Sequence, residues 1–379
     1  MIIAGSGVVD GEDAAALAVR LASLKAAGAC SFLLFAGESC PILEGDWNLL
    51  LRALDMPVAG GIFPQVLCGE VLSDTAVLVI GLQCSFEANL IPRLAETDLR
   101  TMRDLPCTVE GCPCVMVWFD GLAANISSLI EAIYDRLGPA PVFMGGGAGS
   151  LARPGLACVF SNSGALRDAA VVVGLPERLG VGARHGWRQH SGPYLVSEAR
   201  GHEIHTLDYR PAAQVYLEQL RPMLGDLPEA RFCFEYSKSF PFGIERLDGS
   251  FLVRDPIRQE GNSLICVGDV PAQASLHILH GERDDLVGAL INAWHSALQE
   301  LGGSRPGAAL LVDCLSSGLY SGARYPEHLH ELLLRIREQV GNIPLFGVLS
   351  LGEIGSAQGL CLELHNKTSV IGLWRDERS

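Results

Sequence analysis

The sequence predicts an α/β protein in which layered mixed β-sheets are flanked by helices and built from three related strand–helix–strand–hairpin units in two domains. One structural plan recurs three times along the 379 residues. The strands of this plan are continuous apolar runs, which are typical of strands covered on both faces. The helices between them carry apolar residues at helical spacing on one face.

The repeated plan is an apolar strand, an amphipathic helix, a second strand that opens near proline, a glycine-marked turn and a closing apolar strand. The first copy comprises residues 31–37, 46–55, 56–63 and 75–82; the second comprises 114–122, 125–138, 141–150, 156–164 and 168–175; the third comprises 309–319, 326–341, 344–356, 359–369 and 369–374.

The helices of the second and third copies are predicted from spacing and from their end residues. In the second copy, Asn125 is placed to cap the helix and Gly138 to end it. In the third copy, Pro326 opens the helix and Gly341 closes it. The apolar faces consist of Ile126, Leu129, Ile130, Ile133 and Leu137 in one helix, and of Leu329, Leu332, Leu333, Ile336 and Val340 in the other.

The region between the second and third copies has a different pattern. Residues 179–208 predict a strand followed by a hairpin that turns at Arg200-Gly201. A short helix at 211–220, strands within 240–257 and 262–270, and a helix at 284–301 follow. We divide the chain into domains 1–210, with two units, and 211–379, with one, and we expect the turn-rich segment 221–230 to be a hinge.

The composition and the net charge of the chain exclude several classes of function. Apolar residues make up 49% of the chain and the formal charge is −15, so we expect large buried cores and no binding to nucleic acid or anionic membranes. No run of 18 apolar residues predicts a membrane span, and the amino-terminal segment lacks the features of a signal peptide. We therefore expect a cytoplasmic protein whose 12 cysteines are reduced.

Three motifs resemble functional signatures but do not satisfy them. The glycine run 145–150 is not followed by the lysine that a phosphate-binding loop requires. His202 and His205 are three residues apart on a predicted strand and point to opposite faces. His328 and His330 diverge by about 200° on a helix. With no catalytic signature elsewhere, we expect the protein not to be an enzyme.

Cys107, Cys112 and Cys114 form a dense group of thiols. Three thiolates and a fourth ligand are able to hold zinc or an iron–sulfur cluster, although the spacing matches no standard knuckle. The alternative is packing at a loop edge. This group carries the competing functional hypothesis, a metal- or thiol-dependent enzyme, and a ligand-free scaffold is a third possibility.

Four segments resemble FIST proteins, named for F-box and intracellular signal transduction, over nearly the whole chain. They are residues 181–187, 240–257, 312–322 and 345–373, and their order fits a FIST N domain followed by a FIST C domain. The resemblance implies a sensor of a small-molecule or gas ligand that signals to a separate partner, such as a histidine kinase. Some members bind haem and sense nitric oxide, which makes non-covalent haem b the implied cofactor.

The resemblance singles out His185, Trp187, Glu353, His365 and Asn366 as ligand-binding residues. Each also has a structural alternative: core packing for Trp187, a satisfied strand-end histidine for His185, and turn-stabilising hydrogen bonds for Glu353 and Asn366.

If the ligand is haem, His185 is the first choice for the axial position, with Arg184 and Arg188 placed to pair with the propionates. The absence of C-x-x-C-H excludes covalent c-type attachment. The alternative axial ligands are His190, His202 and His205.

Overall fold

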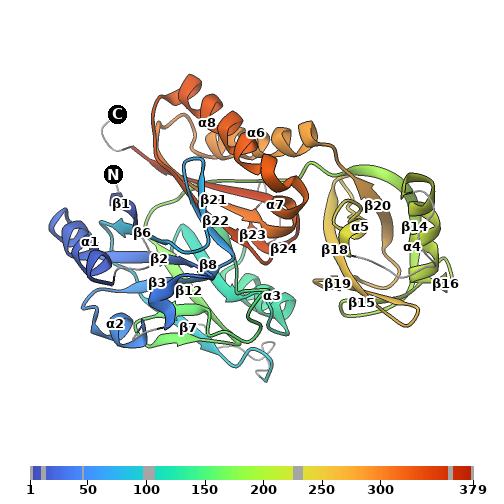
Figure 1. The fold of residues 1–379 in the computed structure, drawn as a ribbon, viewed down its shortest axis with the longest axis horizontal. Helices are drawn as coiled ribbons and strands as arrows, with labels where there is room; N and C mark the ends of the chain where they lie inside the picture. The colour runs from blue at the N-terminus through green and yellow to red at the C-terminus, as the bar shows by residue number, and fades with distance from the viewer. Residues whose placement is uncertain are drawn as a thin grey trace.

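The computed structural model describes residues 3–9, 14–44, 47–96, 107–224, 234–356 and 362–376 and has two lobes (Figure 1). Over these residues, the larger lobe contains three six-stranded sheets and the smaller lobe one seven-stranded sheet. Helices flank the sheets, and both parallel and antiparallel pairs occur within them. The mixed α/β class predicted from the sequence is confirmed.

The three predicted units are present, and each is longer than predicted because another strand precedes it. The first unit comprises β1 (Ile3–Val9), α1 (Ala14–Ala26), β2 (Ser31–Gly37), α2 (Trp47–Ala53), β3 (Val58–Phe63), the hairpin β4 (Gln65–Cys68) and β5 (Val71–Ser73), and β6 (Val77–Leu82). The second comprises β7 (Ala88–Pro92), β8 (Cys114–Asp120), α3 (Ile126–Leu137), β9 (Val142–Ala148), the hairpin β10 (Val159–Ser161) and β11 (Gly164–Leu166), and β12 (Ala169–Leu175). The third comprises β13 (Gly180–Arg184), α6 (Arg283–Glu300), β21 (Pro306–Cys314), α7 (Leu315–Ser321), α8 (Tyr325–Val340), β22 (Leu345–Ser350), the hairpin β23 (Glu353–Gly355) and β24 (Glu363–His365), and β25 (Ser369–Arg375).

The three sheets of the larger lobe share one strand order. The four main strands run β1-β6-β2-β3, β7-β12-β8-β9 and β13-β25-β21-β22. Each sheet is completed by a hairpin from another unit: β10-β11 pairs with β3, β23-β24 with β9, and β4-β5 with β22. Because the hairpins are exchanged in a cycle, no unit completes its own sheet.

A glycine occupies the same position in the second parallel strand of each unit. Gly60, Gly145 and Gly347 lie opposite Leu34, Val117 and Leu311 of the neighbouring strand. A β-carbon at these glycines would lie 1.8, 1.8 and 2.2 Å from the opposing carbonyl oxygens. The close approach of the two backbones therefore requires glycine at each position.

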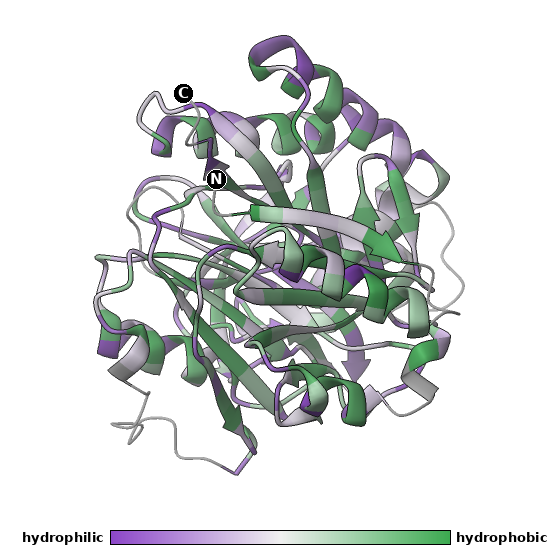
Figure 2. Cartoon of the chain, turned by 90° about the vertical axis from the view of Figure 1, so that its left-hand side faces the viewer, coloured by the Kyte–Doolittle hydropathy of each residue, from purple (hydrophilic) through white to green (hydrophobic). Residues whose placement is uncertain are grey.

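The sheets of the larger lobe pack on a shared apolar core. Phe35, Phe63 and Trp118 meet edge to face there, with ring centroids 4.7–5.8 Å apart. Helix α3 buries Leu129 and Ile133 against the second sheet, as their spacing predicts. Figure 2 shows hydrophobic residues concentrated along the strands and polar residues on peripheral helices and loops.

One detail of α3 corrects the sequence analysis. Asn125 does not cap the helix: its backbone is left-handed (φ 64°), and its side chain makes no capping hydrogen bond. The side-chain amide instead donates to the carbonyls of Leu94 and Ala95, at 3.1 and 3.3 Å. Asn125 thus ties the start of α3 to the segment that follows β7.

The smaller lobe is inserted into the third unit, between β13 and α6. Its elements are β14 (Arg188–Arg200), β15 (Glu203–Leu207), β16 (Arg210–Pro211), α4 (Ala212–Leu224), α5 (Phe234–Ser237), β17 (Phe242–Glu245), β18 (Phe251–Glu260), β19 (Ser263–Val267) and β20 (Ser275–His280). The hairpin predicted to turn at Arg200-Gly201 is confirmed. The sheet order is β14-β20-β17-β18-β19-β15-β16, so strands from both sides of residue 210 share this sheet. The predicted division at residue 210 therefore coincides with no boundary between sheets.

The described chain passes between the lobes at two adjacent points, 185–187 and 281–282. Gly186 and Gly281 lie side by side there, since a β-carbon on Gly281 would be 2.9 Å from the Gly186 carbonyl oxygen. Of the predicted hinge 221–230, residues 225–230 lie outside the described residues. The elements on either side, α4 and α5, both belong to the smaller lobe.

Candidate functional site

The segment His185-Gly186-Trp187 forms one of the two crossings between the lobes. The Trp187 amide donates to His185 Nδ1 at 3.3 Å, so Nε2 carries the proton and donates to the Phe251 carbonyl at 2.9 Å. Burial lowers the pKa of His185, which keeps this neutral tautomer. Both ring nitrogens are therefore engaged in holding the crossing against the smaller lobe.

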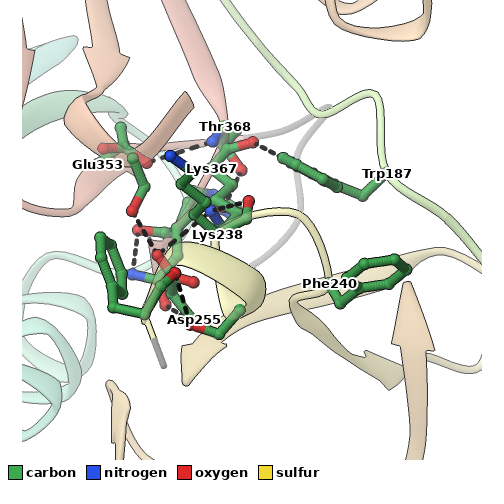
Figure 3. A network of polar contacts seen from close by, with 12 residues as sticks. Trp187, Lys238, Phe240, Asp255, Glu353, Lys367 and Thr368 are labelled. Atoms are coloured by element: carbon green, nitrogen blue, oxygen red, sulfur yellow. Dashed lines mark hydrogen bonds and ion pairs between the residues drawn. The ribbon is translucent and has the colours of Figure 1, made fainter. Parts of the chain in front are cut away.

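Lys367 joins the two lobes at the centre of a polar network (Figure 3). Its side chain is fully buried, and its backbone is left-handed, with φ 51°. The Nζ atom donates to the Lys238 carbonyl at 2.9 Å and pairs with Asp255 Oδ2 at 3.4 Å. It also lies 5.0 Å from the centre of the Trp187 ring, whose indole donates to the Lys367 carbonyl at 3.1 Å. A buried charge in a strained backbone conformation is a feature of functional sites.

Asp255 is the counter-ion of Lys367 and comes from β18 of the smaller lobe. Its side chain is 4% exposed, and Oδ2 also accepts a hydrogen bond from Ser316 Oγ at 2.5 Å. Burial raises the pKa of Asp255, and Lys367 opposes that rise. Oδ1 is buried and has no hydrogen-bond partner among the described residues. A carboxylate oxygen left in this state costs free energy unless another molecule supplies a donor.

Glu353, on β23, is fully buried behind this pair. Burial raises its pKa well above the usual range. Ser350 Oγ lies 2.8 Å from Glu353 Oε1 and 3.2 Å from the Asp313 carbonyl oxygen. A hydroxyl has one proton, so both contacts are satisfied when a neutral Glu353 donates to Ser350 and Ser350 donates to Asp313.

A third buried carboxyl, Asp313, stands at the end of β21. It accepts hydrogen bonds from the Tyr325 hydroxyl, from Ser369 Oγ at 2.8 Å and from the Cys314 amide at 3.0 Å. Burial raises its pKa, although these donors oppose the rise. The carboxyls of Asp313, Glu353 and Asp255 thus share one buried region in which Lys367 is the charged partner that Asp255 contacts.

Comparison of the three units shows that this polarity is special to the third. The strand registers align its buried polar side chains with apolar residues of the first and second units. The equivalents are Val66 and Val159 for Glu353, Ala36 and Phe119 for Asp313, and Phe63 and Ala148 for Ser350. The first and second units have apolar residues at these positions and adopt the same fold. The polar residues of the third unit are therefore not needed for packing, and we expect them to have another role.

A cavity of about 120 Å³ opens between the lobes beside this network. Asp255, Ser316, Ser350 and Asn366 are its polar lining residues with side-chain oxygen atoms. Its walls are mainly apolar and come from α7 and neighbouring loops of the larger lobe and from α5, β18 and β19 of the smaller lobe. Four wall residues are 36–53% exposed at the rim: Leu122, Leu151, Ile257 and Leu319.

The site residues predicted from the sequence are only partly brought together. Asn366 lines the cavity, Glu353 lies behind Ser350, and Trp187 lies behind Lys367. His185 is at the lobe crossing. His365 is buried, donates from Nε2 to the Gly355 carbonyl at 3.1 Å, and is not a lining residue of the cavity. The sequence analysis missed Asp255, Ser316 and Lys367, although all three lie within the segments that resemble the family.

Haem b does not fit this cavity. The described lining residues include no histidine, and a porphyrin is several times larger than benzene, which fills an engineered cavity of about 150 Å³. The alternative axial ligands lie in the smaller lobe: His190 packs on Phe240, His202 lies in the β14–β15 turn, and His205 Nδ1 contacts Ser263 Oγ at 2.9 Å. Haem therefore stays a prediction of the resemblance, which an absorbance spectrum of the purified protein tests.

The structure describes only part of the cysteine group that the metal- or thiol-dependent enzyme hypothesis requires. The side chain of Cys107 lies outside the described residues. Cys114 is buried in β8, and Cys112 is half-buried, with Sγ 3.6 Å from the Thr108 carbonyl oxygen. Burial raises the pKa of both thiols, which disfavours the thiolate that binds metals. Over the described residues, no group of three His, Cys, Asp or Glu side chains is arranged to hold a metal ion.

His365 predicts a measurable pH dependence of stability. Burial lowers its pKa from 6.5 to about 3, so the unfolded chain binds a proton between these values that the folded chain does not. The stabilisation is complete above pH 6.5 and is lost as the pH falls toward 3, at up to about 1.4 kcal/mol per pH unit. In urea unfolding at pH 7.5, 6 and 5, we expect His365→Gln to reduce this slope relative to the parent.

The matched control is His330→Gln, since His330 is exposed on α8. Buried carboxyls such as Glu353 act in the opposite direction, because their raised pKa makes the folded state bind more protons. The difference between variant and parent isolates His365. Equal slopes for the parent and His365→Gln would show that His365 is not held neutral.

Comparison with known protein families gives two matches. The model of the FIST N domain matches residues 32–210, and the model of the FIST C domain matches residues 212–356. The second match includes β18, α7 and β23, and it therefore contains Asp255, Ser316 and Glu353. No curated protein matches the chain. Among the described residues, no helix has the length and apolar character needed to span a bilayer.

Proposed function

Because the chain belongs to the FIST family, whose domains are associated with small-ligand sensing in signal transduction, we propose that it is a sensor whose ligand binds between the two lobes. The observation that carries this proposal is the cavity of about 120 Å³ built from both lobes, beside a buried carboxylate oxygen to which no described residue donates a hydrogen bond. Apolar walls with a few convergent polar groups are typical of small-molecule sites.

The placement of the cavity supplies a signalling mechanism. A ligand that touches Leu319 of the larger lobe and Ile257 of the smaller lobe favours the conformation in which these walls are close. The two lobes are joined by two adjacent crossings, where Gly186 and Gly281 lie side by side. Rotation at these crossings changes the distance between the lobes, and a partner protein that binds one of the two conformations more tightly responds to this change.

The partner and the setting follow from the family resemblance. We propose that the output passes to a separately encoded signalling protein such as a histidine kinase, that the setting is the cytoplasm and that the chain catalyses no reaction. The surface is expected to avoid nucleic acid, because the formal charge of the chain is −15.

The test is to fill the cavity. Leu319 lies on the cavity wall at the end of α7 and is 46% exposed, so Leu319→Trp places an indole in the cavity without disturbing the buried network. In a screen of small fragments by ligand-observed NMR, we expect binders of the parent protein to weaken by at least about tenfold in this variant. Thermal unfolding checks that the variant is folded.

The matched control is Leu334→Trp, which changes an exposed leucine on α8 that does not line the cavity. Fragment binding is expected to be unchanged in this control. If fragments bind equally to the parent and to Leu319→Trp, the ligand site is elsewhere. If no fragment binds the parent, the ligand-free scaffold becomes the better account.

A further inference from the structure

We propose, on the premise that the inter-lobe cavity is the ligand site, that its ligand is a small primary ammonium ion with an apolar tail, bound through Asp255. This deepens the proposed function by naming the chemical class of the ligand. It rests on the hydrogen-bonding capacity, charge, size and polarity of the cavity lining.

The hydrogen-bonding capacity of the lining matches an ammonium group. Asp255 Oδ1 accepts no hydrogen bond from the described residues. Ser316 Oγ uses its proton on Asp255 Oδ2, so it offers the cavity only acceptor capacity. Asn366 Oδ1 accepts one long contact of 3.4 Å from the Asp255 amide and has a second lone pair. An ammonium group has three N–H donors and no acceptor, whereas a hydroxyl group has one donor.

The charge of the site favours a cation. Among the described residues, the cavity lining contains the Asp255 carboxylate and no lysine, arginine or histidine. Behind it, the buried side chains of Glu353 and Asp313 are carboxyl groups, so neither adds positive charge. Lys367 is the only buried cation within hydrogen-bond or ion-pair distance of Asp255 among the described residues, and it lies on the Oδ2 side. An anionic ligand would meet no positively charged side chain among the described lining residues, whereas a cation gains an ion pair with Asp255 in a poorly solvated site.

The volume and the walls set the size of the apolar part. The cavity of about 120 Å³ is slightly smaller than the engineered cavity of about 150 Å³ that holds benzene, which has six carbon atoms. A ligand of about six non-hydrogen atoms therefore fits. Leu315, Leu351 and Val267 line the cavity together with the exposed rim leucines, so the remainder of the ligand is expected to be hydrocarbon.

Isosteric probes test this assignment. Isothermal titration calorimetry compares n-pentylammonium with 1-pentanol and with hexanoate, which share the pentyl chain and differ in the head group. We expect n-pentylammonium to bind at least about tenfold more tightly than either, because its head group forms charge-assisted hydrogen bonds. The same preference is expected to vanish in Asp255→Asn.

A second variant protects the test against a folding failure. Asp255→Asn leaves Lys367 without its counter-ion, so the double variant Asp255→Asn, Lys367→Met restores the charge balance of the buried pair. Loss of pentylammonium binding in both variants, with folding checked by thermal unfolding, supports the ammonium site.

Four results overturn the proposal and are distinguishable. Equal binding of n-pentylammonium to the parent and to the folded double variant would show that Asp255 does not bind the ammonium group. Equal or tighter binding of 1-pentanol or hexanoate to the parent overturns the ligand class. If n-pentylammonium fails while other fragments bind the parent and not Leu319→Trp, the ligand class is wrong but the sensor site stands; if no fragment binds, the proposed function falls as well.

Discussion

Replacing Lys367 by methionine is expected to destabilise the protein by about 3–5 kcal/mol, the usual effect of removing one partner from a buried ion pair. Methionine keeps the length of the side chain and removes the ammonium group. Asp255 then stays buried without a counter-ion, and the hydrogen bond to the Lys238 carbonyl is lost. Urea unfolding at neutral pH measures the change in the free energy of unfolding.

Two comparisons make this result specific. Lys25→Met breaks an exposed pair with Asp55, so it is expected to have little effect on the free energy of unfolding. Adding Asp255→Asn to Lys367→Met is expected to recover a large part of the lost stability, because no unpaired charge stays buried. If Lys367→Met proves no more damaging than Lys25→Met, the ion pair does not hold the two lobes together.

Gly145→Ala is expected to destabilise the larger lobe by about 3 kcal/mol or more. The new β-carbon would lie 1.8 Å from the Val117 carbonyl oxygen, so β8 and β9 must separate. Because a hairpin from the third unit also pairs with β9, the disturbance reaches a second unit. Gly60→Ala, at the equivalent position of the first unit, is expected to have an effect of similar size.

Gly288→Ala is the matched control for these variants. Gly288 lies within α6, and a β-carbon there meets no atom within 4 Å. Alanine in a helix interior is expected to be neutral or to stabilise by up to about 1 kcal/mol. If Gly145→Ala unfolds at the same urea concentration as the parent, the close backbone approach is not required by the fold.

The repeat, the strands and the helices were predictable because their signals are local. Continuous apolar runs and one-sided helical spacing are properties of short segments, and the three units display them independently. Arg200-Gly201 marked a hairpin turn in the same way. The strand β1 and the helix α1 lie ahead of residue 31, where the repeated pattern begins, so the repeat does not predict them.

The exchange of hairpins was not predictable, because pairing partners are a long-range property. Residues 65–68 form a strand whose sequence does not specify which sheet it joins, and it pairs with β22 of the third unit. The insertion of the smaller lobe between β13 and α6 has the same origin. Strand order depends on contacts between distant segments, which no local pattern records.

The candidate site shows the same limit. Asn366 and Glu353 were reached through the family resemblance, whereas Asp255 and Lys367 looked like ordinary charged residues because their pairing joins distant parts of the chain. One signal in the sequence was available: aligned copies of the repeat place Val66 and Val159 where the third unit has Glu353. A carboxyl group at a position that is apolar in the other two copies indicates that the third unit contains the functional site.

Amide hydrogen exchange, measured with and without the tightest-binding fragment, tests the central claim that the ligand binds between the lobes. The account predicts slower exchange on both sides of the cavity, in 251–257 of the smaller lobe and in 314–319 of the larger lobe. The hairpin β14–β15, which does not line the cavity, is expected to be unchanged. Slower exchange confined to one lobe, or to segments away from these walls, would contradict the account.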